Sequence, residues 1–322
     1  MSNSSNGTMQ HEQNTFEFVG EKWNYIKEKR FFGTKIYRSV DGLKYLRIGD
    51  IDKTKSEVTY IEKLRELDFP VPEILDQGMT PESLYYFVER SVGGRSFGDT
   101  FREEYALHGA VSDESVKSFS EIVCTFFRAQ IKSPDQPVLN IDLSKQTMLP
   151  NVLEENPDLN ANQLKECVRR IEDRLSALPQ KFSHGDLAPR NVFKKGIIDF
   201  EYGSIAPIGH DILTAPILER FWGFGSDDKN THEDFYLSET QISDYFMKIE
   251  SEAESHGIKN FLTYRDDFIL LRAIWSLAHE REQAKRAGNT IKWDFRKNIL
   301  IYSIDCYSNQ KPIDTKGFLG LR

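Results

Sequence analysis

The spacing of apolar residues in the first third of the chain predicts a β-hairpin followed by a helix. Residues 35–40 and 43–48 are β-like runs on either side of Asp41-Gly42, a dipeptide typical of two-residue hairpin turns. From Glu57 to Leu67 the apolar residues recur every three or four positions, which is the period of a helix. Phe69-Pro-Val-Pro72 then ends the helix, because a residue that precedes proline disfavours helical geometry.

Beyond a further strand at residues 84–89, the pattern becomes helical. Gly93-Gly94 marks a break in the chain, and no strand-like alternation dominates after Ser96. Helices are predicted at residues 116–130, 160–178, 239–254, 265–287 and 295–307. The sequence therefore predicts an α+β fold in which a small β-rich part, with one helix, precedes a larger and mainly helical part.

Composition removes several classes of function. The formal net charge of −8 over 322 residues disfavours nucleic acid as the main partner, since binding to a phosphate backbone needs a basic surface. No window of ~18 apolar residues predicts a membrane span. Three widely separated cysteines favour neither a disulfide framework nor a zinc site. Residues 1–14 are rich in Ser, Asn and Gln and lack an apolar signal-peptide core, so we expect a disordered tail on a cytoplasmic protein.

The segment from Ser183 to Phe200 carries the candidate chemistry. Asp186 follows His184 by two residues, Asn191 follows Asp186 by five, and Asp199 ends an apolar run. A carboxylate that can take a hydroxyl proton, followed by two oxygen ligands, is what metal-assisted phosphoryl transfer requires. The spacing therefore predicts Asp186 as the base and Asn191 with Asp199 as ligands of Mg2+.

A hairpin is expected to bring the two metal ligands together. Val192-Phe-Lys and Ile197-Ile-Asp-Phe are β-like runs around Lys195-Gly196, which we take as the two turn residues. Pairing outward from that turn sets Val192 opposite Asp199, so Asn191 lies beside Asp199 at ~5–8 Å.

At these residues the chain resembles the aminoglycoside phosphotransferase and choline kinase superfamily, distant relatives of protein kinases. The matching motifs are His-Gly-Asp at 184–186 with Asn191, and Ile-Asp-Phe-Glu at 198–201. The resemblance implies a bilobal, protein-kinase-like fold with a nucleotide-binding lobe at residues 15–92 and a catalytic and substrate lobe at 93–322. ATP, or alternatively GTP, would bind between the lobes with Mg2+.

The resemblance also implies roles for supporting residues of the catalytic segment. His184 would orient the loop that carries Asp186, and Asp211 would brace that loop. Glu201 would contact metal or substrate, or simply pair with a nearby base. Arg190 would either neutralise the transferring phosphoryl group or form a surface ion pair.

The family's phosphate-binding residues can be carried over by alignment. It usually places a lysine on the third strand, held by a helix carboxylate; here Arg47 stands at that position and Glu57 is the helix partner. Arginine is longer than lysine and binds through a bidentate fork, so it is not a neutral replacement. Lys35 or Lys44 could substitute for it.

The remaining nucleotide contacts are expected from main-chain groups. Residues 30–34 would form the phosphate-covering loop, in which Gly33 is the single glycine. The adenine would stack between the lobes and bond to the hinge backbone near Glu89 and Ser91.

The acceptor is the least defined partner. Residues 219–224 and Trp275 with 279–282 lie where the family builds its acceptor site, and aromatic rings with carboxylates suit an ammonium group. They equally suit a helical core with a charged rim. The implied function is transfer of the γ-phosphoryl group to a hydroxyl of a small amino-alcohol, aminoglycoside or sugar-like acceptor, by a monomer or homodimer.

The sequence leaves two alternatives open. One is a choline or ethanolamine kinase proper. The other is a nucleotide-binding pseudokinase that acts as an interaction module, which Arg47 suggests because it replaces the usual lysine.

Overall fold

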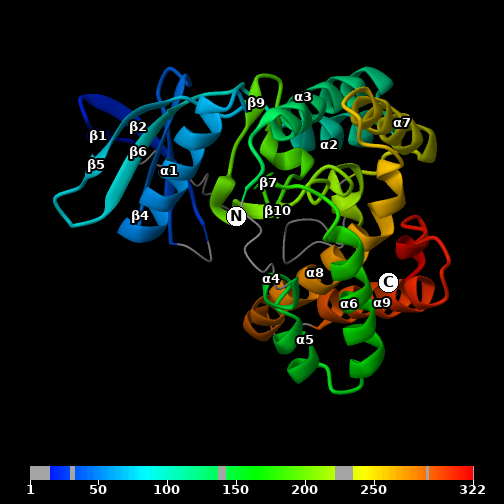
Figure 1. Cartoon of the computed structure of the whole chain (residues 1–322). Helices are drawn as coiled ribbons and strands as arrows, with labels where there is room; N and C mark the ends of the chain where they lie inside the picture. The colour runs from blue at the N-terminus through cyan, green and yellow to red at the C-terminus, as the bar shows by residue number, and fades with distance from the viewer. Residues whose placement is uncertain (1–14, 30–32, 137–142, 222–234, 288–289, 322) are drawn as a thin grey trace, which may run out of the picture.

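The computed structural model describes residues 15–29, 33–136, 143–221, 235–287 and 290–321, so the predicted tail at 1–14 lies outside the described residues. In the described chain, six antiparallel strands form one sheet in the order β1-β2-β3-β4-β6-β5 (Figure 1). These are β1 (Thr15–Phe18), β2 (Glu21–Glu28), β3 (Lys35–Ser39), β4 (Lys44–Gly49), β5 (Ile74–Met79) and β6 (Tyr85–Arg90). Together with helix α1 (Ile51–Glu66) they make up the part that we call the N-lobe.

The hairpin predicted around Asp41-Gly42 is confirmed. β3 and β4 pair through Tyr37 and Leu46, and Gly42 has a φ of 75°, a conformation that glycine adopts without the penalty paid by other residues. One face of the sheet buries Trp23, Leu46 and Val88 in a small core of its own. The alternation of side chains along the strands leaves the opposite face to the helical part of the molecule.

The rest of the chain, which we call the C-lobe, is mainly helical, as predicted. Its described helices are α2 (Phe97–His108), α3 (Asp113–Lys132), α4 (Leu143–Gln146), α5 (Leu149–Glu155), α6 (Ala161–Leu175), α7 (Glu239–Ser255), α8 (Arg265–Ala287) and α9 (Ile291–Ser308). Short strands form two further pairs, β7 (Gln180–Ser183) with β10 (Ser204–Pro207) and β8 (Val192–Phe193) with β9 (Gly196–Ile197). Short 3-10 turns lie at η1 (Pro189–Asn191), η2 (Phe200–Tyr202), η3 (Ala215–Phe221), η4 (Phe261–Tyr264) and η5 (Gly317–Leu321).

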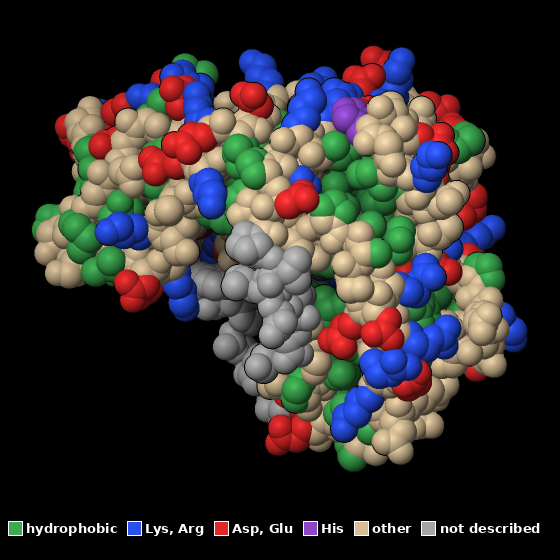
Figure 2. Space-filling model, viewed as in Figure 1, with side chains coloured by type: hydrophobic (Ala, Val, Ile, Leu, Met, Phe, Trp, Pro, Cys, Tyr) green, Lys and Arg blue, Asp and Glu red, His purple; other side chains and the backbone are tan. Residues whose placement is uncertain are grey.

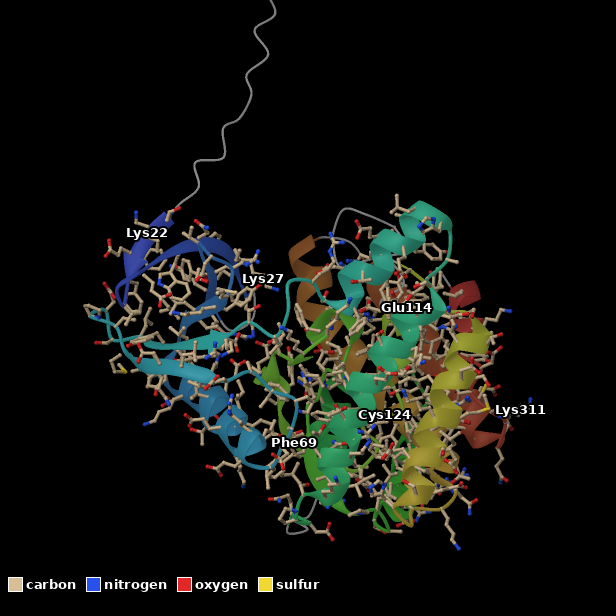
Figure 3. All side chains as sticks on the ribbon, turned by 90° about the horizontal axis from the view of Figure 1, so that it is seen from above. Lys22, Lys27, Phe69, Glu114, Cys124 and Lys311 are labelled. Carbon is tan, nitrogen blue, oxygen red and sulfur yellow. The ribbon has the colours of Figure 1, made fainter. Side chains whose placement is uncertain are left out.

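All five helices predicted in the C-lobe are present as α3, α6, α7, α8 and α9, and α8 has the predicted bounds. α3 and α7 pack side by side in Figure 3. Helix α2 was not predicted. It begins after Ser96, whose side chain accepts a hydrogen bond from the Asp99 N–H, and ends at Gly109 in the left-handed conformation.

Helix α1 joins the two lobes. It begins at Ile51, six residues before the predicted start, because Asp50 caps it by accepting a hydrogen bond from the Lys53 N–H. Its buried residues Ile61 and Leu64 belong to the large core of the C-lobe, and Phe69 lies at the junction between the lobes in Figure 3. The N-lobe is therefore docked through this helix. The predicted division of the chain after residue 92 stays a prediction.

The surface is polar and mixed in charge. Acidic and basic side chains are interspersed over the face shown in Figure 2. Within the described part of the chain, no helix combines the length and apolarity that a membrane crossing requires.

Candidate active site

The loop after β7 presents Asp186, and the carboxylate of Asp211 holds that loop in shape. Asp211 accepts hydrogen bonds from the Ser183 hydroxyl at 2.8 Å, the His184 N–H at 2.8 Å and the Gly185 N–H at 2.9 Å. Burial opposes ionisation of Asp211, but its hydrogen bonds, first the one with His210 and then the one with the His184 N–H, lower its pKa to about 2. Asp211 is thus ionised and fully buried, and it braces the loop of Asp186, which is the role that the resemblance implies for it.

His184 is a structural residue of the same loop. Its Nε2 lies 2.8 Å from the Ile198 carbonyl and its Nδ1 accepts the Asp186 N–H at 3.1 Å. A ring with one nitrogen donating and the other accepting is neutral. The ring is fully buried and packs against Phe200, so it links the loop of Asp186 to the loop of Asp199.

One oxygen of Asp186 is held and the other is available. Oδ2 accepts hydrogen bonds from Arg190 at 2.8 Å and from the Asn191 amide at 3.3 Å. Oδ1 is buried and has no hydrogen-bond partner in the described chain. A buried carboxylate oxygen without a donor is costly, and a substrate hydroxyl would satisfy it.

Asn191 and Asp199 meet at the end of the β8–β9 hairpin, although the predicted register is wrong. Val192 pairs with Ile197, not with Asp199, and the turn residues are Lys194-Lys195. Asn191 therefore lies opposite Ile198, whose N–H donates to the Asn191 carbonyl at 2.9 Å. Both Asn191 and Asp199 still line one cavity.

The glycine that suggested the wrong turn has another reason to be there. A Cβ on Gly196 would lie 2.9 Å from the Pro70 carbonyl oxygen and 3.0 Å from the side chain of Val92. The hairpin also bonds to the segment between α1 and β5, because the Ile197 N–H donates to the Pro70 carbonyl at 2.7 Å. Close packing against Pro70 and Val92, rather than a positive φ, requires glycine at this position.

Asp199 sits in an unusual backbone conformation among cations. Its φ of 75° and ψ of 56° are left-handed, a state that aspartate tolerates better than most residues but that still stores strain. Lys29 Nζ contacts its carboxylate and Arg47 lies 3.7 Å from it. Burial opposes ionisation, but these two cations hold the pKa of Asp199 well below its usual range.

Glu201 lies beside Asp199 and shares the same lysine. Lys29 Nζ is 2.7 Å from Glu201 Oε2. Burial and then repulsion by Asp199 raise the pKa of Glu201 to about 7, although Lys29 acts in the opposite direction. Of the roles left open for Glu201, pairing with a nearby base is present in the structure.

Lys29 is the main residue of the site that sequence reasoning missed. It directly follows β2 and is almost fully buried, with 9% of its surface exposed. Burial disfavours the ammonium, but the charges of Asp199 and Glu57 more than offset this and raise the pKa of Lys29. The two lysines proposed as substitutes for Arg47 are elsewhere: Lys35 is exposed and Lys44 pairs with Glu21.

The predicted ion pair of Arg47 with Glu57 is confirmed, at 3.1 Å between NH1 and Oε1. A second carboxylate, not predicted as a partner, is closer: Arg47 Nε and NH2 each lie 2.9 Å from Glu89 Oε1. Arg47 is buried, with 2% of its surface exposed, so its guanidinium is clamped between strand and helix carboxylates. Its contact with phosphate stays a prediction.

Breaking this clamp should destabilise the protein. Arg47→Met would leave Glu57 and Glu89 as unpaired buried carboxylates, which costs about 3–5 kcal/mol when one partner of a buried pair is lost. We expect that decrease in the free energy of unfolding, measured by urea denaturation. The matched control is Arg90→Met on β6, because the Arg90–Glu73 pair is mostly exposed and should contribute about 1 kcal/mol or less. Equal losses in the two variants would contradict the clamp.

The charges around Asp199 fit a divalent cation. Two cations, Lys29 and Arg47, face four carboxylates: Glu57, Glu89, Asp199 and Glu201. If all four carboxylates are ionised, the cluster lacks two positive charges; burial, together with repulsion between the carboxylates, raises the pKa values of Glu89 and Glu201. No group of three or more His, Cys, Asp or Glu in the described chain is arranged as a complete metal cage. Mg2+ typically takes one or two protein ligands and completes its shell with water and phosphate oxygens, so this donor set suits it.

A cavity of about 420 Å³ runs between the lobes from the hinge to Asp199. Its lining at the hinge end is partly apolar, from Ile36 and Tyr45 of the sheet and Phe193 and Ile198 of the hairpin. Glu89 and Ser91 also line it, but the Ser91 N–H donates to the Leu43 carbonyl at 2.9 Å. An adenine would have to use other main-chain groups of this segment.

Gly33 closes the loop that was expected to cover the phosphates. Its φ is 63°, and a Cβ would meet no atom within 4 Å, so backbone conformation alone favours glycine. Its N–H donates to the Lys29 carbonyl at 2.9 Å. Residues 30–32 of the predicted loop lie outside the described residues.

Part of the region predicted to hold the acceptor lies within the described residues. Arg190 bridges Asp186 and Glu219, and Trp275 packs edge-on against Tyr202. Arg272 of α8 donates to the Gly185 carbonyl at 3.0 Å and so supports the catalytic loop. Residues 222–224 and the side chains of 279–282, predicted to take part in the acceptor site, lie outside the described residues.

Comparison with known proteins finds a family and several solved structures that are similar to this chain. The family model described as "APH: Phosphotransferase enzyme family" matches residues 43–255. No curated protein matches the chain significantly.

Solved structures show the same fold at low sequence identity. The GDP complex of an aminoglycoside 2'-phosphotransferase IIIa is 15% identical, with a TM-score of 0.54 over 93% of each chain. The ternary complex of aminoglycoside phosphotransferase APH(4)-Ia with AMP-PNP and hygromycin B is 15% identical, with a TM-score of 0.53 over 89% of this chain and 93% of that one. An aminoglycoside 3'-phosphotransferase of type VIII is 16% identical, with a TM-score of 0.52 over 82% and 94%.

Proposed function

Because this chain belongs to the phosphotransferase enzyme family, we propose that it transfers the γ-phosphoryl group of ATP, or of GTP, to a hydroxyl of a small amino-alcohol, aminoglycoside or sugar-like acceptor. The observation that carries the proposal is the buried Oδ1 of Asp186, which has no donor in the described chain and lies on the loop that leads to Asn191. A positioned acceptor hydroxyl would supply the missing donor.

The chemistry needs one proton transfer and one exchange of bonds at phosphorus. Asp186 accepts the proton of the acceptor hydroxyl while the hydroxyl oxygen bonds to the γ-phosphorus. The bond from the γ-phosphorus to the β–γ bridging oxygen breaks, so the nucleoside diphosphate leaves with that electron pair. Arg190 holds Oδ2 of Asp186, which keeps Oδ1 directed at the acceptor.

Two residues are proposed to hold the metal. Asn191 Nδ2 donates to the Asp186 carbonyl at 2.9 Å, which leaves the amide oxygen as its ligand atom, and Asp199 offers an ionised carboxylate. When bound there, Mg2+ supplies positive charge to the phosphate oxygens in the transition state. Asp211 and His184 keep the two loops in register for this purpose.

The proposal is tested by a phosphate-transfer screen. ATP and GTP are each offered with amino alcohols including choline and ethanolamine, amino sugars, and aminoglycosides including hygromycin B, and the phosphorylated acceptor is detected by mass spectrometry. We expect magnesium-dependent phosphorylation of at least one acceptor class. Turnover restricted to choline or ethanolamine would identify the narrower alternative.

One observation favours a second candidate. Lys29 contacts the proposed metal ligand Asp199 and its neighbour Glu201, and a lysine fixed there would weaken metal binding. A pseudokinase that binds nucleotide as an interaction module would then bind ATP without phosphorylating any acceptor. That result in the same screen would replace the kinase proposal.

A further inference from the structure

Lys29 reaches the site because the strand before it is irregular. The register of β2 against β3 shifts between Tyr25 and Lys27, so Ile26 is an extra residue in β2. A bulge of one residue turns the following side chains to the other face of a sheet. Lys27 consequently pairs with Ile36, whose partner on β4 is Arg47, on the face that looks into the interlobe cavity. Two residues further along, Lys29 lies on that same face.

The backbone of Lys29 is fixed at both of its polar groups. Its N–H donates to the Thr34 carbonyl at 2.8 Å, and its carbonyl accepts the Gly33 N–H at 2.9 Å. The base of the loop is therefore closed, and the ammonium can change partners by rotation of its four-carbon side chain alone.

Arg47 is poorly placed to take the phosphates itself. Nε and NH2 are bonded to Glu89 and NH1 to Glu57, while the guanidinium also lies over the Phe87 ring at 5.6 Å. All three nitrogens are engaged with carboxylates in a buried position, and releasing any of them would leave a buried charge unpaired. Lys29 holds two carboxylates through one ammonium, and both belong to the segment where the metal is proposed to bind.

From this arrangement we propose that Lys29 is the phosphate-contacting cation of the site, and that without nucleotide its ammonium occupies the cation position at Asp199 and Glu201. The inference rests on the proposed function, since it assumes a magnesium–nucleotide substrate. An ammonium and a divalent cation cannot share Asp199 at close range because like charges repel strongly where water is scarce. When the metal arrives with the nucleotide, Lys29 moves to a phosphate oxygen, which offers it a new negative partner.

This exchange couples the metal to the nucleotide. Free metal must displace Lys29 from two carboxylates without offering it another partner, so it binds weakly. Metal that arrives with a triphosphate brings the replacement partner along. The size of this coupling is set by the difference between two metal affinities of the site: the affinity when Lys29 contacts Asp199 and the affinity when Lys29 contacts a phosphate oxygen.

The first test compares Lys29→Met with Lys22→Met, an exposed lysine on the same strand that lies far from the interlobe cavity in Figure 3. Mn2+ binding without nucleotide is followed by electron paramagnetic resonance, and binding of Mg2+–ADP, Mg2+–AMP-PNP and adenosine by calorimetry. In Lys29→Met we expect Mn2+ to bind about tenfold more tightly, because a competing charge is gone. We expect the phosphorylated nucleotides to bind about tenfold or more weakly, because a charge-assisted hydrogen bond is lost, and adenosine to bind as before.

Lys22→Met should match the parent protein in every one of these measurements, and Lys29→Arg should retain part of the nucleotide affinity. Unchanged binding of both Mn2+ and phosphorylated nucleotide in Lys29→Met overturns the inference, and so does an equal loss for adenosine. A parent protein that binds neither Mn2+ nor nucleotide overturns it as well.

A second test needs no variant, in case Lys29→Met does not fold. In a crystal structure of the parent protein with Mg2+ and AMP-PNP, Lys29 Nζ should lie within hydrogen-bond distance of a phosphate oxygen and away from Asp199. A lysine still bonded to Asp199 overturns the inference. The proposed function can fail separately. Phosphate binding that depends on Lys29, without phosphorylation of any acceptor, would contradict the proposed kinase activity and support the inference about Lys29.

Discussion

Asp186→Asn is expected to lower kcat by about 10²–10⁴, because a positioned acid–base group contributes that much to the rate. The Kd for nucleotide should stay nearly unchanged, since Asp186 is not among the residues that line the cavity in which we propose that the nucleotide binds. The amide preserves the shape of the side chain but cannot take the hydroxyl proton. Turnover is measured with the acceptor found in the screen, and nucleotide affinity by calorimetry.

The matched control is Asp173→Asn, an exposed aspartate of α6 that pairs with Arg169 on the surface. This variant should keep both kcat and nucleotide affinity. If Asp186→Asn turned over near the parental rate, Asp186 would not be the base. An equal loss of nucleotide affinity and of kcat would mean that the substitution had disturbed the loop that Asp211 braces. The cause would then be sought in the hydrogen bonds that Arg190 and Asn191 donate to Asp186 Oδ2.

The larger elements of the fold could be predicted because their signals are local. Helices α3 and α8 have long apolar stripes, and the β3–β4 hairpin has a turn dipeptide whose glycine does adopt a positive φ. Helix α2 carries local signals too, a Ser cap and a C-terminal Gly, but only Phe97, Gly98 and Phe101 of its 12 residues are buried, so its apolar stripe is short. The capping residues therefore predict helix α2 better than the spacing of its apolar residues does.

The hairpin at Asn191 shows where local reasoning fails. Local composition favours Lys195-Gly196 as the turn because glycine is common in turns, whereas the close approach of Pro70 and Val92 is what requires glycine at position 196. That contact involves residues more than a hundred positions away along the chain, and no local pattern reports it. Asn191 and Asp199 still line the same cavity because a shift of two residues keeps both at the same end of the hairpin.

Lys29 was missed for a related reason. It is a charged residue at a strand end, which is most often solvated, and counting alternation from the buried Trp23 puts it on the wrong face. The extra residue at Ile26 reverses that alternation, and nothing in the composition of β2 marks it. The partners of Lys29 lie 170 and 172 residues away. The ion pair of Arg47 with Glu57, by contrast, could be carried over from a family motif, while the contact with Glu89 could not.

Asp199→Ala is expected to abolish phosphoryl transfer and to weaken ATP binding only when magnesium is present. Asp199 is the proposed anionic ligand, and its low pKa means that the carboxylate is ionised over the whole physiological range of pH. Asn191→Ala should have a smaller effect, because a neutral ligand is lost. Affinities for ATP are measured by calorimetry with Mg2+ and with a chelator, in the parent and in both variants.

The same variant separates the metal from the lysine. Asp199→Ala also removes one of the two carboxylates that hold Lys29, so without magnesium the freed ammonium should bind ATP as tightly as in the parent protein, or more tightly. Asp158→Ala, an exposed aspartate that pairs with Lys297, serves as the control and should change neither value. Equal affinity of the parent protein for ATP with and without magnesium would show that Asp199 does not act as a metal ligand. A loss of ATP affinity in Asp199→Ala that is just as large with the chelator would instead make Asp199 a residue that shapes the nucleotide cavity.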